Sequence, residues 1–206
     1  MKPFVKTLFT ATVALGLAWS AQAQNVPANT APEVFIKAIA TDLLDTVKND
    51  KAAQAGDAAR INAIVNDKVL PYVDLARMTQ GSVGRNWSKA TLEQQATLQK
   101  EFRVMLQRTY GGALALAKDA TLQMRPFRGA ADETDVVVRS NVLVPKGDPI
   151  GMDYRLEKVG GAWKVYDLNV ANSWLVQNYQ GVFAKEVDAG GIEGLIKFMQ
   201  TRNKSK

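Results

Sequence analysis

One carboxylate in the middle of a predicted strand is the first group that could do chemistry. Asp167 lies within residues 162–170, among apolar and aromatic side chains, where a charge needs a partner or a pocket. It could be the general base of a small isomerase or hydrolase on a cone-shaped α+β fold. It could also be a structural carboxylate that pairs with an arginine or caps a helix. We expect the structural role, because buried paired carboxylates outnumber catalytic ones.

Three other polar groupings have simpler explanations than catalysis. Ser173 precedes a helical pattern without a Ser-x-x-Lys arrangement, so we expect it to be a structural N-cap. Asp74 and Arg77 lie three positions apart on a predicted helix, a spacing typical of a surface ion pair. The glycine turn at residues 81–84 has no lysine after it and therefore does not fit a phosphate-binding loop.

The composition excludes whole classes of site. The 206 residues include no His and no Cys, which excludes a Ser-His-Asp triad, a Cys-His pair and the usual zinc sites. We therefore expect no metal and no cofactor. The formal net charge of +6 comes from basic residues scattered along the chain, so a nucleic-acid-binding protein is the least favoured class.

Residues 1–23 have the pattern of a secretory signal peptide. Lys2 and Lys6 precede an apolar run too short to span a bilayer, and residues 21–23 read Ala-Gln-Ala, a signal-peptidase site. A bacterial signal of this kind predicts a cleaved leader and the periplasm of a Gram-negative bacterium as the destination. We expect residues 24–206 to be a single soluble domain.

Helical periodicity covers the first and last parts of the mature chain. Apolar residues recur every three or four positions over residues 35–47. A longer helix is expected from residues 91–94, where Thr-Leu-Glu-Gln has the spacing of a capping box. The helical pattern returns after Ser173, and the pair Gly190-Gly191 separates a last helix from it.

Strand periodicity covers the segment between these helices. Residues alternate in character over 135–145, 150–157 and 162–170, after a shorter alternation at 122–124. The run 162–170 carries apolar residues at both odd and even positions, so we expect cover on both of its faces. Strands segregated from helices in this way predict an α+β fold, with a twisted antiparallel sheet of about four strands packed against several helices.

Long and aromatic side chains face inward from the predicted long helix and strands. Methionine adapts to irregular contents, so such a set could line a cavity. An ordinary close-packed core explains the same residues, and periodicity alone favours that core.

Four motifs follow one another along the chain: VGRNW at 83–87, WKVYDL at 163–168, SWLVQNY at 173–179, and GIEGLI at 191–196. In this order and spacing they resemble the MlaC family of periplasmic phospholipid-binding proteins, also called toluene-tolerance proteins. Two positions depart from the family pattern. Ala171 stands where the family has a turn glycine, and Gln180 stands where it often has an arginine. If that arginine pairs with the strand carboxylate, Asp167 needs another partner here.

The resemblance implies a soluble carrier that hydrolyses nothing and moves a phospholipid across the periplasm. Its implied partners are the ring-forming substrate-binding protein of an inner-membrane lipid ABC transporter and an outer-membrane lipoprotein–porin complex. The acyl chains would lie in a slot between the sheet and the long helices. An enzyme using Asp167, and a periplasmic adaptor with a filled core that binds only proteins, stay open as alternatives. On the resemblance we assign twelve lipid-binding residues: Phe102, Met105, Leu106, Tyr110, Met124, Val138, Met152, Tyr154, Trp163, Val165, Leu175 and Tyr179.

Overall fold

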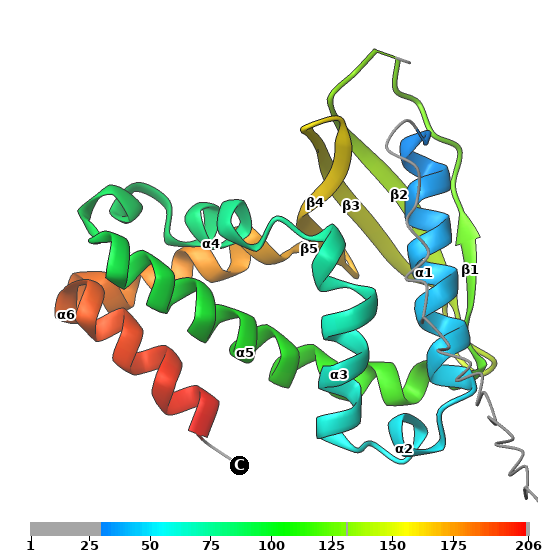
Figure 1. The fold of residues 1–206 in the computed structure, drawn as a ribbon, viewed down its shortest axis with the longest axis horizontal. Coiled ribbons are helices and arrows are strands. Elements are labelled where there is room, and N and C mark those ends of the chain that lie inside the picture. Colours follow the sequence, from blue (N-terminus) through cyan, green and yellow to red (C-terminus); the bar gives the residue numbers. More distant parts are fainter. Residues whose placement is uncertain (1–29, 131, 205–206) are drawn as a thin grey trace, which may run out of the picture.

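The computed structural model describes residues 30–130 and 132–204, so the predicted signal peptide lies outside the described residues. Within them the chain forms helices, then an antiparallel sheet, then a long kinked helix (Figure 1). The predicted α+β class is confirmed. The α-helices are α1 (Pro32–Lys48), α2 (Lys51–Gln54), α3 (Ala58–Lys68), α4 (Leu75–Val83), α5 (Leu92–Leu116) and α6 (Leu175–Lys204). The strands are β1 (Thr121–Met124), β2 (Asp135–Leu143), β3 (Ile150–Val159), β4 (Ala162–Val170) and β5 (Ser173–Trp174).

Two short 3-10 turns, η1 (Leu70–Tyr72) and η2 (Gly84–Lys89), link helices, and a third, η3 (Ala117–Asp119), joins α5 to β1. Side-chain caps mark where α2, α3, α4 and α5 begin. The predicted capping box is present, because the Thr91 hydroxyl accepts from the backbone N–H of Gln94 while the Gln94 side chain accepts from the N–H of Thr91. Asp74 caps α4 by accepting from the backbone N–H of Arg77 at 2.8 Å.

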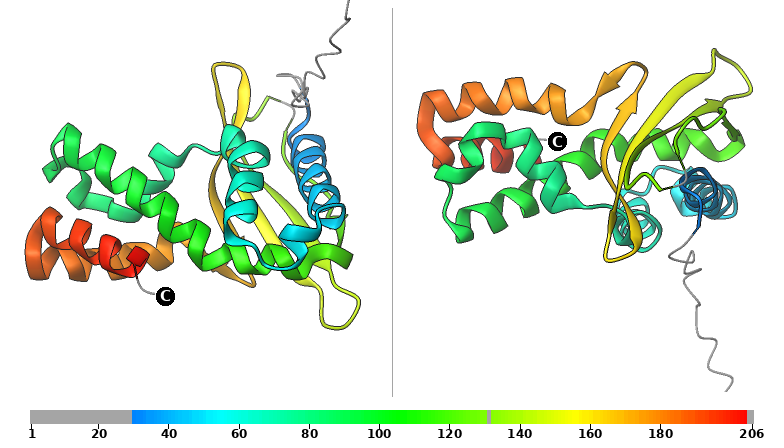
Figure 2. Two further views of the ribbon diagram at one scale, coloured as in Figure 1. Left: turned by 60° about the horizontal axis from the view of Figure 1, so that its bottom comes forward. Right: turned by 90° about the horizontal axis from the view of Figure 1, so that it is seen from above.

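The glycine pair in α6 separates two helical segments, as predicted. Gly190 and Gly191 have non-helical backbone angles, with φ of 67° at Gly191. Glycine reaches this left-handed region at no steric cost, so the chain can turn here. The second segment returns beside α5, and the two helices pack together (Figure 2).

The five strands lie in chain order, β1-β2-β3-β4-β5, and every neighbouring pair is antiparallel. The strand beyond the roughly four that we predicted is β5, which has only two residues. A tight turn joins it to β4, with positive φ at both Ala171 (49°) and Asn172 (67°). Asparagine tolerates this conformation, whereas alanine adopts it only with strain.

A bulge in β4 changes which residues share a face of the sheet. Arg155 of β3 lies opposite Asp167, but the next residue, Leu156, lies opposite Val165, so Tyr166 is the extra residue. On one side of the bulge the odd-numbered Val165 shares a face with Leu156. On the other side the even-numbered Leu168 shares that same face with Tyr154. The mixed parity of apolar residues in β4 thus comes from the bulge, not only from cover on two sides.

We call the face that α1 covers the inner face of the sheet. Helix α1 lies along β1 and β2, and its Phe35 and Ile36 join a packed apolar cluster with residues of β2, β3 and β4 (Figure 1). Helices α4 and α6 pack beside β4. Helix α5 packs mainly against α3, α4 and α6 (Figure 2).

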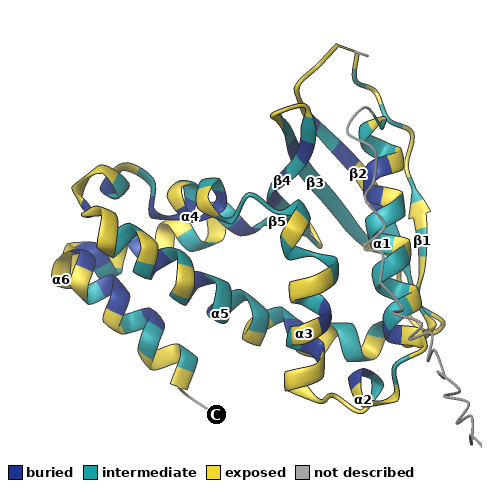
Figure 3. Cartoon of the chain, in the orientation of Figure 1, coloured by how far each residue is buried: buried dark blue, intermediate teal, exposed yellow. Residues whose placement is uncertain are grey.

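The apolar core is divided. One cluster lies among α4, α5 and α6, a second lies between α1 and the inner face, and a small third cluster lies around α3. Figure 3 shows buried residues at both of the larger clusters, on the sheet and on α5 and α6. Val73 contacts both larger clusters. The fold therefore has separate helical and sheet layers rather than one continuous core.

Candidate functional site

The twelve predicted lipid-binding residues do not form one continuous lining. Phe102, Met105, Leu106 and Tyr179 belong to or pack on the helical cluster. Five others belong to or pack on the sheet cluster, and three belong to no cluster. The five are Met124, Val138, Tyr154, Trp163 and Val165, and the three are Tyr110, Met152 and Leu175.

Half of the inner face is apolar yet only partly packed. In the other half, the side chains pack in the apolar cluster under α1, where Val138 and Leu156 are almost fully buried. Toward the β2–β3 hairpin and β5, the apolar side chains are half-buried and lie outside the packed clusters. These residues are Leu122, Val142, Met152, Leu168 and Val170.

Register shows that these five half-buried residues share the inner face. Val142 lies opposite Leu122 on one side, and Met152 lies opposite Val170 on the other. Leu168 lies opposite Tyr154, one step along the same face. Four of the five were missing from our sequence-based set. Leu168 and Val170 were hidden by the bulge, because simple alternation placed them with the polar Lys164.

Two tyrosines, Tyr110 of α5 and Tyr179 of α6, lie at one end of the helical cluster. The Tyr179 ring packs edge-on against Phe102, with ring centroids 4.9 Å apart. One turn and a half beyond Met105, Tyr110 is half-buried and interacts with Tyr179. Burial, and to a smaller degree the contact with Tyr179, raises the pKa of Tyr110 to about 12. The Tyr110 phenol therefore stays neutral at ordinary pH.

Two hollows in the described part of the chain lie elsewhere. One, of about 390 Å³, lies at the α6 kink and includes Lys89 and Gly191 in its wall. The other, of about 370 Å³, lies on the exposed side of α1 beside Val34 and Asp45. None of the twelve predicted residues lines either hollow.

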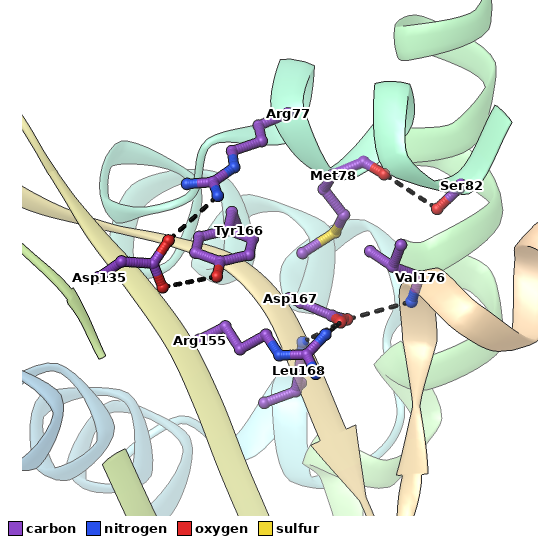
Figure 4. Close-up of polar contacts among 9 residues, drawn as sticks. All are labelled: Arg77, Met78, Ser82, Asp135, Arg155, Tyr166, Asp167, Leu168 and Val176. Carbon is purple, nitrogen blue, oxygen red and sulfur yellow. Dashed lines mark hydrogen bonds and ion pairs between the residues drawn. The ribbon is translucent and has the colours of Figure 1, made fainter. Parts of the chain in front are cut away.

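Asp167 is enclosed by donors (Figure 4). Its side chain is 1% exposed; Oδ1 accepts from the backbone N–H of Leu168 at 2.9 Å and of Val176 at 3.0 Å. Its Oδ2 accepts from Arg155 at 3.1 Å. Burial raises the pKa of Asp167, and these donors oppose that rise. A carboxylate held on all sides in this way has no open position from which to take a substrate proton.

Two expectations about neighbouring residues were wrong. Ser173 is not the N-cap of α6, because it lies in β5 and accepts a hydrogen bond from the Asn178 side chain. Asp167 of β4 instead accepts a hydrogen bond from the backbone N–H of Val176, in the first turn of α6. It lies nine residues before Val176, too far along the chain for the local spacing of an N-cap. Asp74 and Arg77 do not form a surface ion pair, since the Asp74 carboxylate caps α4.

The Arg77 guanidinium reaches the outer face of the sheet (Figure 4). It pairs with Asp135 at 3.2 Å and with Glu157, and it stacks on the Tyr166 ring, 3.5 Å from the centroid. The Tyr166 hydroxyl donates to Asp135 at 2.7 Å. These contacts tie α4 to β2, β3 and β4. They join the helical layer to the sheet, which indicates a structural role.

Among residues 30–130 and 132–204, no group of His, Cys, Asp and Glu side chains is arranged to hold a metal ion. No helix in that part of the chain combines the length and apolar character needed to cross a bilayer. The candidate functional site is the half of the inner face whose apolar side chains are only partly packed, which we call the half-packed surface.

Comparison with known proteins relates this fold to lipid binding. Residues 37–201 match the family described as MlaC protein. The intermembrane phospholipid transport system binding protein MlaC of Haemophilus influenzae is 26% identical over 180 residues, covering 84% of this chain and 82% of that protein. The toluene tolerance protein ttg2D of Pseudomonas putida is 26% identical over 161 residues, covering 78% and 74% of the two chains.

A solved structure extends the likeness to three dimensions. The phospholipid-binding protein of Ralstonia solanacearum, determined in complex with a phospholipid, is 42% identical and superposes with a TM-score of 0.82. The match covers 84% of this chain and 97% of that one.

Proposed function

The chain belongs to the MlaC family, and on that premise we propose that it is a periplasmic carrier that holds a phospholipid by its acyl chains. It shuttles this cargo between an outer-membrane lipoprotein–porin complex and the ring-forming substrate-binding protein of an inner-membrane lipid ABC transporter. No cofactor takes part, and the lipid is cargo rather than substrate.

The observation that carries this proposal is the half-packed inner face of the sheet. A monomer gains by burying apolar side chains, so a sheet face that leaves Met152, Leu168 and Val170 half-buried keeps surface available for something else. Each CH₂ group buried there is worth about 0.8 kcal/mol, so two acyl chains supply a large driving force. The phospholipid held by the relative from Ralstonia solanacearum supports the same choice of ligand.

We place the acyl chains against this surface, between the sheet and α5. Helix α5 packs chiefly on other helices rather than on the strands, so it does not occupy the same apolar surface. The head group then stays in solvent, which explains why binding needs no cluster of charged side chains at the site. The arrangement suits a carrier that must release its cargo intact.

The test is mass spectrometry of an organic extract from the mature protein, residues 24–206, purified from a bacterial periplasm without detergent. We expect about one glycerophospholipid per protein, lost after extraction and regained on incubation with phospholipid vesicles. A protein that yields no lipid and takes none from vesicles contradicts the proposal. The adaptor with a filled core would then take its place.

A further inference from the structure

Two hydroxyl groups stand on the otherwise apolar inner face. Ser140 of β2 is fully buried, and its neighbours across the strands are Met124 and Met152. Tyr154 of β3 lies opposite Val138 and Leu168 on the same face. The two side chains are in contact, with their oxygens 3.3 Å apart.

Neither hydroxyl has a hydrogen bond of ordinary length within the described part of the chain. Ser140 has two acceptors within reach, the Tyr154 oxygen at 3.3 Å and the backbone oxygen of Met152 at 3.5 Å. The Tyr154 proton points to the Met152 sulfur at 3.9 Å. Hydroxyl–oxygen bonds are normally near 2.7–2.8 Å, and a thioether is a weak acceptor. The donor chain therefore ends without a good acceptor.

A buried donor without an acceptor costs free energy, so its presence calls for an explanation. Burial raises the pKa of Tyr154, which keeps the phenol protonated and able to donate. Valine at position 140 and phenylalanine at position 154 would suit an apolar core better. The two hydroxyls nevertheless lie side by side on the inner face.

The two hydroxyls lie at the border between the two halves of the inner face. On one side lies the packed cluster that contains Val138 and Leu156. On the other side lie the half-buried Met152, Leu168 and Val170. A ligand on the half-packed surface therefore lies next to the half-buried Tyr154, which has the fully buried Ser140 behind it.

We propose that Tyr154, which accepts from Ser140, donates a hydrogen bond to an ester carbonyl of the bound lipid, and that the pair so selects acyl-ester lipids. This inference rests on the proposed function. Apart from the head group, the ester carbonyls are the good hydrogen-bond acceptors that a diacyl lipid carries. An ether-linked lipid of the same shape lacks the carbonyl and leaves the Tyr154 hydroxyl without a good acceptor. The pair thus recognises the linkage, while the apolar surface holds the chains.

The test is a loading competition. The mature protein is incubated with vesicles that contain equal amounts of diester and diether phosphatidylethanolamine and phosphatidylglycerol with matched chains. The protein is then separated and its lipid is extracted and quantified by mass spectrometry. We expect wild type to load the diester lipids about five- to tenfold over the diether lipids, the size of effect produced by one buried hydrogen bond. Tyr154→Phe should load both kinds equally, and Ser140→Ala should reduce the preference.

A matched control lies on the opposite face. Tyr166→Phe also removes one phenolic hydroxyl, but that hydroxyl donates to Asp135 outside the proposed site. This variant should keep the wild-type preference for diester lipids. Thermal unfolding followed by circular dichroism checks that all three variants are folded.

The outcomes separate this inference from the proposed function. Equal loading of both lipids by wild type overturns the inference and leaves the carrier intact, and so does a Tyr154→Phe variant that keeps the diester preference. Failure of wild type to load either lipid overturns the carrier and this inference together.

Discussion

Arg155 and Asp167 face each other across β3 and β4, directly at the bulge, with 3.1 Å between the guanidinium and the carboxylate. The arginine, 40% exposed in its side chain, also stacks on Trp174, 4.0 Å from the ring centroid. Arg155 is therefore the partner that Asp167 needs in the absence of an arginine at position 180.

Asp167→Asn tests the structural role of this pair. The amide oxygen can keep the two backbone donors, Leu168 and Val176, but the amide NH₂ then meets the Arg155 guanidinium, donor against donor. We expect the free energy of unfolding to fall by about 1–3 kcal/mol, measured by urea denaturation. Lipid loading should be unchanged in the folded variant.

A double-mutant cycle supplies the control. Once position 167 is Asn, Arg155→Gln should cost less than it costs in wild type, because the two residues act as one unit. Additive losses would contradict the pairing. A fully stable Asp167→Asn that had lost a defined turnover would instead favour an enzyme.

Ala171→Gly should stabilise the protein. Ala171 holds a φ of 49° in the turn between β4 and β5, a conformation that costs alanine but not glycine. We expect a gain of about 1 kcal/mol, seen as a higher midpoint in chemical denaturation. Ala96→Gly, at an exposed position in the second turn of α5, is the matched control and should lose about 1 kcal/mol. A loss at position 171 as large as at position 96 would show that the turn is unstrained.

The sheet could be predicted from sequence because its signals are local. Residues 135–143 and 150–159 alternate regularly, and glycine-containing turns join the strands, so their pairing follows. The bulge could not be predicted, since Tyr166 as an extra residue looks like ordinary alternation until the partner strand is known. Because of this one extra residue, Leu168 and Val170 lie on the inner face, where they form part of the candidate site.

Polar contacts between residues far apart in the chain could not be predicted from the sequence either. A serine just before a helix is the common local cap, so Ser173 was the natural candidate. The group that meets the α6 N-terminus is Asp167, and only the packing of β4 beside α6 brings the two together. Likewise Arg77 has its partners on β2 and β3, which no spacing along α4 reveals.

Tyr110→Phe should change the alkaline limit of stability. The pKa of Tyr110 rises from 10.0 to about 12 in the folded protein, so folding favours the neutral phenol. Stability from this group is fully present below pH 10.0 and is lost as the pH rises toward about 12. We expect urea denaturation across this range to show a steeper loss for wild type than for Tyr110→Phe. Equal slopes would contradict the burial of this phenol.

A tryptophan series tests where the cargo lies. Val138 is 1% exposed inside the packed cluster, so Val138→Trp should overpack it and cost about 1–3 kcal/mol. Leu168 and Met152 are half-buried outside the packed clusters, and a ring there occupies space proposed for an acyl chain. Leu168→Trp and Met152→Trp should therefore keep near-normal stability and purify with less phospholipid per protein.

The control for this series is Val182→Trp on α6, where the valine is 41% exposed and belongs to no packed cluster. It should change neither the denaturation midpoint nor the lipid content. If Leu168→Trp and Met152→Trp destabilise the protein as much as Val138→Trp does, and wild type yields no lipid, the inner face is a packed core. If both variants are stable but carry as much lipid as wild type, the acyl chains lie elsewhere. Loss of lipid without loss of stability, confined to these two positions, is the result that only a cargo surface explains.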